Sequence, residues 1–435
     1  MKKYKIVILV CAFTILGIFT CRVSKTSNVY EENENNQMKK QVNTISMMLE
    51  TEAGSGKYEM TTRDSWPTEG YVFNSTLSKC ENGGELSWDD TNKKVLMSGN
   101  ISDKCYVYFD IETKVFLADY VKSLYTGTQG DNNIYYHDSS LENGAGDNSY
   151  RYAGSSETTN NYVCFGSDAD TCPEDNLYRI IGVFDGKVKL IKSTGTTNTL
   201  LGTDGTYTSN SGSYTWTDLD SCPSTTAYKF DNNVVVLSNK NILGAVPGGG
   251  KSGGCNMWKY SNLNSVNLNT NFITNLGIKW AALVDNATWK VSGYSTANVT
   301  AKTMYTAEIT NATKTYGPSD GTSKIGLMYA SDYGFAASPS AWTTLLSSYN
   351  DSSIKSTNWI YNAGMEWTMT PNSSNSYSVF ILSYVSTVSN TGNLGTWSSL
   401  GADAGFGTRP AMYLNASVVY TRGSGTASDP IRIEI

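Results

Sequence analysis

Histidine and charged residues are scarce in this chain of 435 residues, which has one histidine and only 17% charged residues, against about 25% in typical soluble domains. A catalytic triad needs a histidine that a carboxylate holds in place. His137 has Asp138 beside it, but the segment 135–138 is irregular and predicts an exposed loop histidine. No catalytic constellation stands out, so we expect a protein that is not an enzyme.

Metal and nucleotide motifs are also missing. There is no Cys-x-x-Cys pair, which with a single histidine argues against zinc. The acidic cluster at 168–175 does not match an EF-hand loop and predicts a solvated loop. The segment 247–252 ends in Gly-Lys-Ser, but its offset from Gly244 is wrong for a phosphate-binding loop. We therefore expect no metal and no cofactor.

The composition excludes nucleic acid as a partner and excludes disorder. The formal net charge is −6, so no electrostatic footprint for nucleic acid exists. Aromatic residues make up 12% of the chain, and 29 residues are tyrosine, which is not a disordered composition. The abundance of Asn, Ser, Thr, Tyr and Gly suits the exposed strands and long loops of an extracellular protein.

The N-terminus has the pattern of an export signal. A basic start at 1–5 precedes an apolar run from Ile6 to Phe19, shorter than the roughly 20 residues of an ordinary spanning helix. Three interpretations remain: a cleaved signal, a lipoprotein modified at Cys21, and an uncleaved anchor whose lysines hold the cytoplasmic end. The anchor is favoured because the residues before Cys21 fit the other two poorly. We expect a cell-surface protein anchored in the membrane, with its bulk extracellular.

Cysteine usage agrees with export. Six cysteines follow the apolar segment, and an even number in an exported chain indicates disulfides. Six cysteines allow fifteen connectivities. Neighbour pairing fits a modular chain and predicts the bonds Cys80–Cys105, Cys164–Cys172 and Cys222–Cys255.

The predicted fold class is α+β, with five segments. Residues 1–22 form the anchor or signal, 23–56 a helical stalk, 57–110 a small disulfide-stapled β module, 111–160 a helix and an irregular linker, and 161–435 the main domain. The stalk is predicted from the apolar stripe Met38, Val42, Ile45 and Leu49, whose spacing suits one face of a helix.

The strongest local signal lies in the main domain. Two runs of strand-forming residues, 177–184 and 187–192, flank Asp185-Gly186. This dipeptide is typical of a two-residue hairpin turn. The sequence therefore predicts a β-hairpin at 177–192.

Four segments of the main domain carry a resemblance to a known family: 176–182, 324–334, 366–368 and 407–414. Together they resemble bacterial surface proteins with a C-type lectin-like domain, of the type found in formylglycine-generating enzymes and in the variable proteins of diversity-generating retroelements. The resemblance implies that the Glu-Trp-Thr strand at 366–368 and the strand at 407–414 bracket a variable, ligand-facing stretch. It also implies that the small Cys80–Cys105 module accompanies such a domain.

The departures from that family bear on the chemistry. No cysteine follows Cys255, so the reactive cysteines of a formylglycine-generating enzyme are missing. Neither Glu-Pro-Asn, Gln-Pro-Asp nor Trp-Asn-Asp, the calcium ligands of sugar-binding C-type lectins, occurs. Asp332 and Glu366 are the best single carboxylates for acid–base work, since aromatic neighbours can raise a carboxyl pKa. Within this fold Glu366 and Arg409 are expected to be structural.

The segment from Pro371 to Thr408 is the candidate ligand-facing surface. It has one charged residue and is rich in Ser, Asn, Thr, Tyr and Gly, the mixture that recognition loops use. Ordinary exposed strands are the alternative interpretation. The predicted ligand-binding residues are Tyr377, Phe380, Tyr384, Asn390, Asn393, Trp397, Asp403 and Phe406.

These observations predict a non-catalytic cell-surface binding protein, adhesin-like, whose partner is an extracellular protein or glycan. Two other functions remain open. A structural subunit of a surface appendage would need an exposed apolar patch or strand edge, and an extracellular hydrolase would need a cleft with paired carboxylates.

Overall fold

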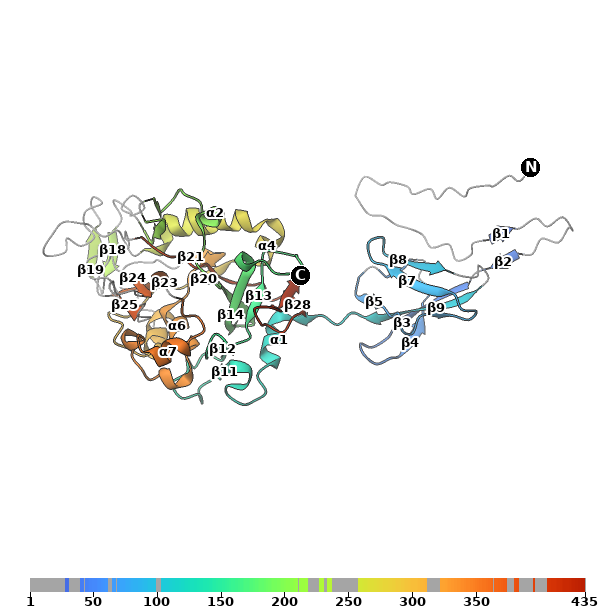
Figure 1. Ribbon diagram of the computed structural model, residues 1–435, viewed down its shortest axis with the longest axis horizontal. Coiled ribbons are helices and arrows are strands. Elements are labelled where there is room, and N and C mark those ends of the chain that lie inside the picture. Colours follow the sequence, from blue (N-terminus) through green and yellow to red (C-terminus); the bar gives the residue numbers. More distant parts are fainter. Residues whose placement is uncertain are drawn as a thin grey trace. The chain divides into compact units, whose positions relative to one another are not determined.

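The computed structural model describes residues 28–30, 40–42, 44–61, 65–67, 69–98, 103–209, 211–217, 227–230, 233–236, 257–310, 321–362, 364–373, 379–382, 394–395 and 405–434 (Figure 1). The chain divides into two compact units, Met1–Lys114 and Val115–Ile435, here called the first unit and the main unit. The predicted anchor at 1–22, the Gly-Lys-Ser segment at 247–252 and the pair Cys222–Cys255 lie outside the described residues.

The first unit is built from short strands. They are β1 (Asn28–Tyr30), β2 (Lys40–Val42), β3 (Thr44–Glu50), β4 (Tyr58–Met60), β5 (Tyr71–Phe73), β6 (Lys79–Cys80), β7 (Glu85–Asp89), β8 (Lys94–Ser98) and β9 (Lys104–Ile111). One sheet has the order β4-β3-β9-β5, with β6 also paired to β9, and β7 and β8 form a separate hairpin. Its buried core is small: Met47, Val107 and Phe109, covered by partly buried aromatic residues.

The predicted helical stalk is wrong. Of the stripe that predicted it, Val42 lies on β2, Ile45 and Leu49 lie on β3, and Met38 lies outside the described residues. Strand β3 runs parallel to β9, with Ile45 opposite Cys105. Met47 and Leu49, two residues apart, pack into the core, and Ile45, on the same face near the start of β3, is exposed. Pairing with β9 stabilises this segment as a strand, whereas a short isolated helix would have no such partner. Side chains two positions apart therefore share a face.

The main unit contains many short strands. They are β10 (Val115–Phe116), β11 (Ile134–His137), β12 (Ser149–Tyr152), β13 (Tyr162–Cys164), β14 (Leu177–Phe184), β15 (Lys187–Lys192), β16 (Tyr207–Thr208), β17 (Ser213–Thr215), β18 (Ala227–Phe230), β19 (Asn233–Val236), β20 (Ala287–Trp289), β21 (Gly321–Ser323), β22 (Ile325–Gly326), β23 (Glu366–Pro371), β24 (Val379–Leu382), β25 (Leu394–Gly395), β26 (Gly405–Phe406), β27 (Ala411–Tyr413), β28 (Val419–Arg422) and β29 (Arg432–Glu434).

Its helices are short as well. They are α1 (Leu117–Ser123), η1 (Asp131–Asn133), η2 (Glu174–Asn176), α2 (Asn198–Leu201), η3 (Trp258–Tyr260), η4 (Leu263–Phe272), α3 (Ile273–Leu276), α4 (Ile278–Leu283), α5 (Ala301–Tyr305), η5 (Thr306–Thr310), α6 (Ala330–Ala336), η6 (Pro339–Ala341), η7 (Leu346–Ser348) and α7 (Ser352–Ser356). Two of them, η4 and η5, are π-helices.

The largest sheet of the main unit has seven strands in the order β11-β12-β14-β15-β27-β22, with β13 also paired to β14. The predicted hairpin at 177–192 is confirmed as β14 and β15, which pair antiparallel. Its turn residues Asp185 and Gly186 have φ of 48° and 77°. Both positive values fit the type I′ turn that an Asp-Gly pair favours. The hairpin and β12 form the wall from which the site described below is built.

The predicted fold class is corrected by the structure. Strands dominate, and helical residues make up 23% of it, so the α+β class with a helical stalk is wrong. Among the described residues, none of the helices has the length and apolar character needed to cross a membrane. The main unit also begins at Val115 rather than at residue 161, because β11 and β12 join the large sheet.

Two of the three predicted disulfides are confirmed. Cys80 and Cys105 face each other across β6 and β9, and Cys164 is bonded to Cys172 at the end of β13. Two such bonds are typical of an oxidising, extracellular environment.

Candidate ligand-binding cavity

A cavity of about 460 Å³ opens in the main unit beside the β14–β15 hairpin. Four basic and four acidic side chains line it: Arg151, Lys187, Lys189 and Lys290 with Asp147, Asp185, Asp285 and Asp332. The aromatic rings of Phe184, Tyr305, Tyr329 and Tyr413 complete the wall. The lining is therefore rich in charge but balanced in sign.

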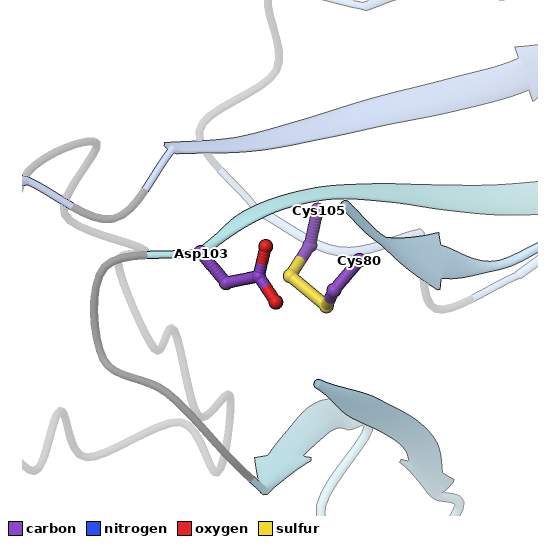
Figure 2. Close-up of side chains that lie close together, drawn as sticks. All are labelled: Cys80, Asp103 and Cys105. Atoms are coloured by element: carbon purple, nitrogen blue, oxygen red, sulfur yellow. A yellow bond between two sulfur atoms is a disulfide. The ribbon is translucent and has the colours of Figure 1, made fainter. Parts of the chain in front are cut away.

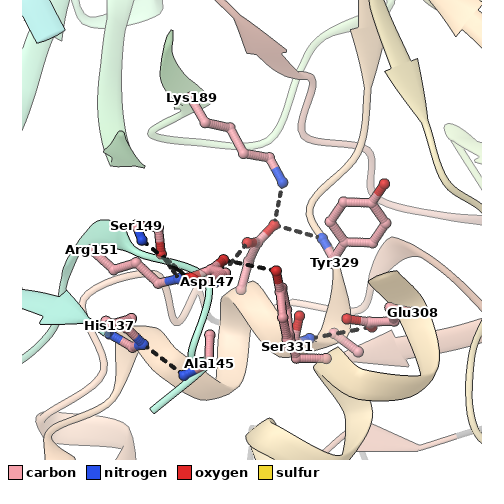
Figure 3. A network of polar contacts seen from close by, with 12 residues as sticks. His137, Ala145, Asp147, Ser149, Arg151, Lys189, Glu308, Tyr329 and Ser331 are labelled. Atoms are coloured by element: carbon pink, nitrogen blue, oxygen red, sulfur yellow. Dashed lines mark hydrogen bonds and ion pairs between the residues drawn. The ribbon is translucent and has the colours of Figure 1, made fainter. Parts of the chain in front are cut away.

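A buried ion pair joins β15 to α6. The Lys189 Nζ lies 2.5 Å from Asp332 Oδ2, and the two side chains are only 1% and 2% exposed. The backbone N–H of Tyr329, at the start of α6, donates to the same oxygen at 2.9 Å. Burial lowers the pKa of Lys189, and the charge of Asp332 opposes that effect. In Figure 3 a dashed line from the nitrogen of Lys189 marks this ion pair.

Arg151 on β12 anchors the second ion pair. Its Nη2 lies 2.6 Å from Asp147 Oδ2, its Nε donates to Ser149 Oγ at 2.8 Å, and its Nη1 lies 3.8 Å from Asp332 Oδ1. The guanidinium also lies within 5.0 Å of the ring centroids of Phe184, Tyr305 and Phe335. Such cation–π contacts stabilise a desolvated guanidinium.

Asp147 is held in its ionised form. Burial acts to raise the pKa of this carboxyl, but Arg151 and the hydroxyls of Ser149 and Tyr305 outweigh burial and lower it. Tyr305 Oη donates to Asp147 Oδ2 at 2.8 Å. An ionised carboxylate accepts hydrogen bonds but cannot act as a general acid at neutral pH.

Glu308, on the π-helix η5, is a fully buried carboxyl next to this network. Burial raises its pKa to about 7. Its Oε1 accepts hydrogen bonds from Thr370 Oγ1 at 2.5 Å and from the Ser331 backbone N–H at 3.3 Å. Its Oε2 and the Oγ of Ser331 have no hydrogen-bond partner in the part of the chain that the structure describes. Ser331 lines the cavity, whereas Glu308 is not among the lining residues.

The expectation of an exposed His137 is wrong. The side chain is fully buried, and its ring centroid lies about 5 Å from those of Phe335 and Trp342. Its Nδ1 accepts the N–H of Ala145 at 3.0 Å (Figure 3). Burial lowers the pKa of His137 well below its ordinary value, so this histidine is neutral and structural.

At the rim of the cavity the charges reach solvent. Lys187 Nζ lies 2.6 Å from Asp285 Oδ2, with side chains 40% and 21% exposed. Lys290 donates to the carbonyl of Ile309 at 2.8 Å. Asp185, in the hairpin turn, is the fourth acidic residue of the lining. These rim groups are in position to meet a ligand that enters from solvent.

Of the two carboxylates selected from the sequence, one lies in the cavity and one does not. Asp332 lines the cavity, whereas Glu366 pairs with Arg409 at 2.7 Å, both side chains nearly fully buried. Arg409 also donates to the carbonyl of Ile360 at 2.8 Å. The structural role expected for Glu366 and Arg409 fits these contacts.

The predicted ligand-binding segment is described only in part. Phe380 is fully buried on β24, and Phe406 is 5% exposed and packs edge-on against Trp367. Both are core residues, since β24 is buried at all four of its positions and Phe406 packs on the buried Trp367. The six other candidates lie outside the described residues: Tyr377, Tyr384, Asn390, Asn393, Trp397 and Asp403.

One group of side chains in the described residues has the ligand types of a metal site: Cys80, Asp103 and Cys105 (Figure 2). Both sulfur atoms are in the disulfide, so no thiolate is free to bind a metal. The Asp103 carboxylate accepts the backbone N–H groups of Asn82, Gly84 and Lys104. This carboxylate therefore fixes a turn of the first unit.

Comparison with known proteins found no relative of this chain. No protein-family model, no curated protein and no solved structure matches the chain. Nothing in these comparisons identifies a C-type lectin-like domain. The arguments about function therefore start from the cavity itself.

Sequence reasoning missed most of the cavity. Lys189 lies in the run Lys187-Val188-Lys189, where alternation suggests that both lysines face solvent, yet Lys189 is buried. Arg151 was assigned to an irregular linker, and Glu308 carried no motif. A single charged residue between apolar or aromatic strand residues, as at Lys189 and Arg151, could have indicated a buried charge. A buried charge requires a partner, so this pattern predicts an ion pair.

Proposed function

We propose that the chain is an exported binding protein whose main unit takes a neutral, polyhydroxylated ligand of the glycan class in this cavity. The single observation that carries the proposal is the lining, which combines four cations, four anions and four aromatic rings. A sugar offers hydroxyl groups that donate and accept, together with apolar C–H faces. Charged donors and acceptors on fixed side chains suit the hydroxyl groups, and aromatic rings suit the apolar C–H faces.

The charge balance narrows the ligand class. An excess of one sign would select an oppositely charged ligand, but the basic and acidic groups of this lining are equal in number. The deep charges are already paired within the wall, as in Arg151–Asp147 and Lys189–Asp332. A neutral ligand can accept hydrogen bonds from the cations and donate to the anions without breaking either pair.

The same contacts favour binding over hydrolysis. Glycoside hydrolysis requires one protonated carboxyl beside one ionised carboxyl. The pKa of Asp147 is lowered, and Asp332 is bound to Lys189 and to a backbone N–H. Glu308, whose pKa is raised to about 7, is not among the residues that line the cavity. The described residues therefore provide acceptors and donors for a ligand rather than an acid and base.

An oligosaccharide array carrying neutral and acidic glycans tests the proposal. The purified full chain should bind neutral glycans, and Asn286→Trp, which places a bulky ring in the exposed part of the lining, should abolish that binding. The matched control is Ala169→Trp, at an exposed position outside the lining. Binding that survives Asn286→Trp, or that is confined to acidic glycans, would contradict the proposal.

A further inference from the structure

We propose that the side chains of Lys189 and Asp332 condense to form an amide, a covalent isopeptide cross-link between β15 and α6. The ammonium nitrogen and the carboxylate oxygen lie 2.5 Å apart, and both side chains are almost fully buried. The two residues are 143 positions apart in the sequence. This cross-link is a property of the folded main unit and does not depend on glycan binding. It leaves three cations and three anions in the cavity lining, which is still balanced in sign.

Burial removes almost all of the water that would stabilise the two charges, and three aromatic rings take its place around the Lys189 nitrogen. The Lys189 Nζ lies 4.4 Å from the ring centroid of Tyr329, 5.4 Å from that of Tyr413 and 5.5 Å from that of Trp289. Ions transferred from water into such an environment lose hydration that their mutual attraction only partly restores. Burial also lowers the pKa of Lys189. A neutral amine is the nucleophilic form of lysine.

The reaction balances without any added reagent. A proton first moves from the Lys189 ammonium to the Asp332 carboxylate, through the direct contact between them. The neutral amine then attacks Cγ of the carboxylic acid, forming the C–N bond. One carboxyl oxygen leaves as water, with one proton from the acid and one from the amine. The product is a neutral amide, and no oxidant, reductant or cofactor takes part.

The fold holds the reacting groups and offers stabilising contacts. The proton from Lys189 goes to Oδ2, which becomes the leaving hydroxyl, and Arg151 Nη1 lies 3.8 Å from Oδ1, where negative charge develops when the amine adds to Cγ. The Asp332 side chain lines the cavity, which gives the released water a way out. Enforced contact between two such groups corresponds to a very high effective concentration, of order 10⁵ M or more in well-oriented systems.

Charge in the network remains balanced after the reaction. Condensation removes one cation and one anion, and it leaves Arg151 paired with Asp147 at 2.6 Å. The Arg151 guanidinium is only 3.8 Å from Asp332 Oδ1, so loss of the carboxylate alone would leave the cation less well compensated. When the charges of Lys189 and Asp332 are lost together, the net charge around Arg151 does not change.

A second lysine–aspartate pair in the cavity lining serves as a comparison for Lys189 and Asp332. Lys187 and Asp285 are the same two residue types at nearly the same separation, 2.6 Å, but their side chains are 40% and 21% exposed. Water reaches both of these side chains, so they should remain an ordinary ion pair. Burial is the feature that distinguishes the reactive pair.

Peptide mapping by mass spectrometry tests the cross-link. The full chain, purified after export, is denatured, reduced, alkylated and digested with trypsin. We expect a branched peptide that joins the segments containing Lys189 and Asp332 and weighs one water molecule less than their sum, with no cleavage after Lys189. The segments containing Lys187 and Asp285 should not be joined to each other.

Variants complete the test. In Asp332→Ala and in Lys189→Ala the branched peptide should disappear, whereas Lys279→Ala, which alters an exposed lysine paired with Asp168, should retain it. Should a cavity variant fail to fold, the map of the unaltered chain still decides. Recovery of Lys189 and Asp332 only in separate linear peptides would overturn the proposal, as would a branched peptide that persists in Asp332→Ala.

Discussion

At the scale of single residues, the main unit differs from an ordinary β-rich domain in the number of charges that it buries. Arg151, Lys189, Asp332 and Glu308 are all nearly inaccessible to solvent. Buried charges destabilise a fold unless they are paired or neutralised. Arg151, Lys189 and Asp332 are in ion pairs. The raised pKa of Glu308 favours its neutral, protonated form.

Glu308 gives the protein a pH dependence of known sign. Its folded pKa, about 7, lies above the ordinary value of 4.5, so the folded state binds more protons between these values. Its contribution to stability is therefore complete below about pH 4.5 and is lost as pH rises through 7. At about 1.4 kcal/mol per pKa unit, the loss is about 3 kcal/mol.

Denaturant unfolding of the unaltered chain and of Glu308→Gln, from pH 4 to pH 8, measures that contribution. The difference between the two free energies of unfolding should shift by about 3 kcal/mol against the unaltered chain as pH rises. Other titrating groups, including His137, are common to both proteins and cancel. A difference that stays constant with pH would show that Glu308 does not titrate in this range.

The residue scale also shows where sequence reasoning succeeds. Asp332 was selected because aromatic residues flank it, and it proved central to the cavity. The expectation for His137 failed because polar neighbours in the sequence did not reveal the rings of Phe335 and Trp342, which come from distant segments. Burial by distant segments leaves little local signal.

At the scale of elements, the β14–β15 hairpin positions the site, and two glycines in it have different roles. Gly186 has φ of 77° with no atom near the place that a Cβ would occupy. Gly182 lies opposite Arg151 on β12, and a Cβ there would be 2.3 Å from the carbonyl oxygen of Tyr150. The first glycine serves the turn, and the second permits the close approach of β12.

Alanine substitution separates these roles. Gly186→Ala should cost about 1 kcal/mol of stability, the penalty for a left-handed conformation at a single residue. Gly182→Ala should cost about 3 kcal/mol or more, because rigid backbone must shift to relieve the contact. Denaturant unfolding of both variants checks the order, and equal costs would contradict the close packing of β12 on β14.

The secondary-structure elements also show where the spacing of apolar residues fails to predict helix or strand. The Asp-Gly turn was predictable because its conformation is local and few dipeptides adopt it. The segment at 44–50 was predicted as helix, yet it forms β3 because it pairs in parallel with β9, some 60 positions later in the chain. Short apolar patterns leave helix and strand ambiguous, and partners distant in the sequence decide.

At the scale of the whole molecule, the two units differ in how they are stabilised. The main unit has a large continuous core, whereas the hydrophobic core cluster of the first unit, among its described residues, consists of Met47, Val107 and Phe109. A small core leaves a unit dependent on covalent links. The bond between Cys80 and Cys105 joins β6 to β9, the strand around which that sheet is built.

Removal of this bond should therefore destabilise the first unit strongly. We expect Cys80→Ser with Cys105→Ser to cost about 2–4 kcal/mol, the usual range for a native disulfide. Hydrogen exchange should show faster exchange throughout β3, β5 and β9, with little change in β14 and β15. Unchanged exchange in β9 would contradict the dependence of this unit on the bond.

The central claim, that the cavity binds a neutral glycan, is tested most directly by calorimetric titration. The glycan selected on the array is titrated into the unaltered chain and into the double variant Asp185→Ala with Lys187→Ala, which removes two charged groups from the cavity lining. The account predicts one site per chain and affinity at least about tenfold weaker in the variant, a change of about 1.4 kcal/mol. Equal affinity in the two proteins would contradict it.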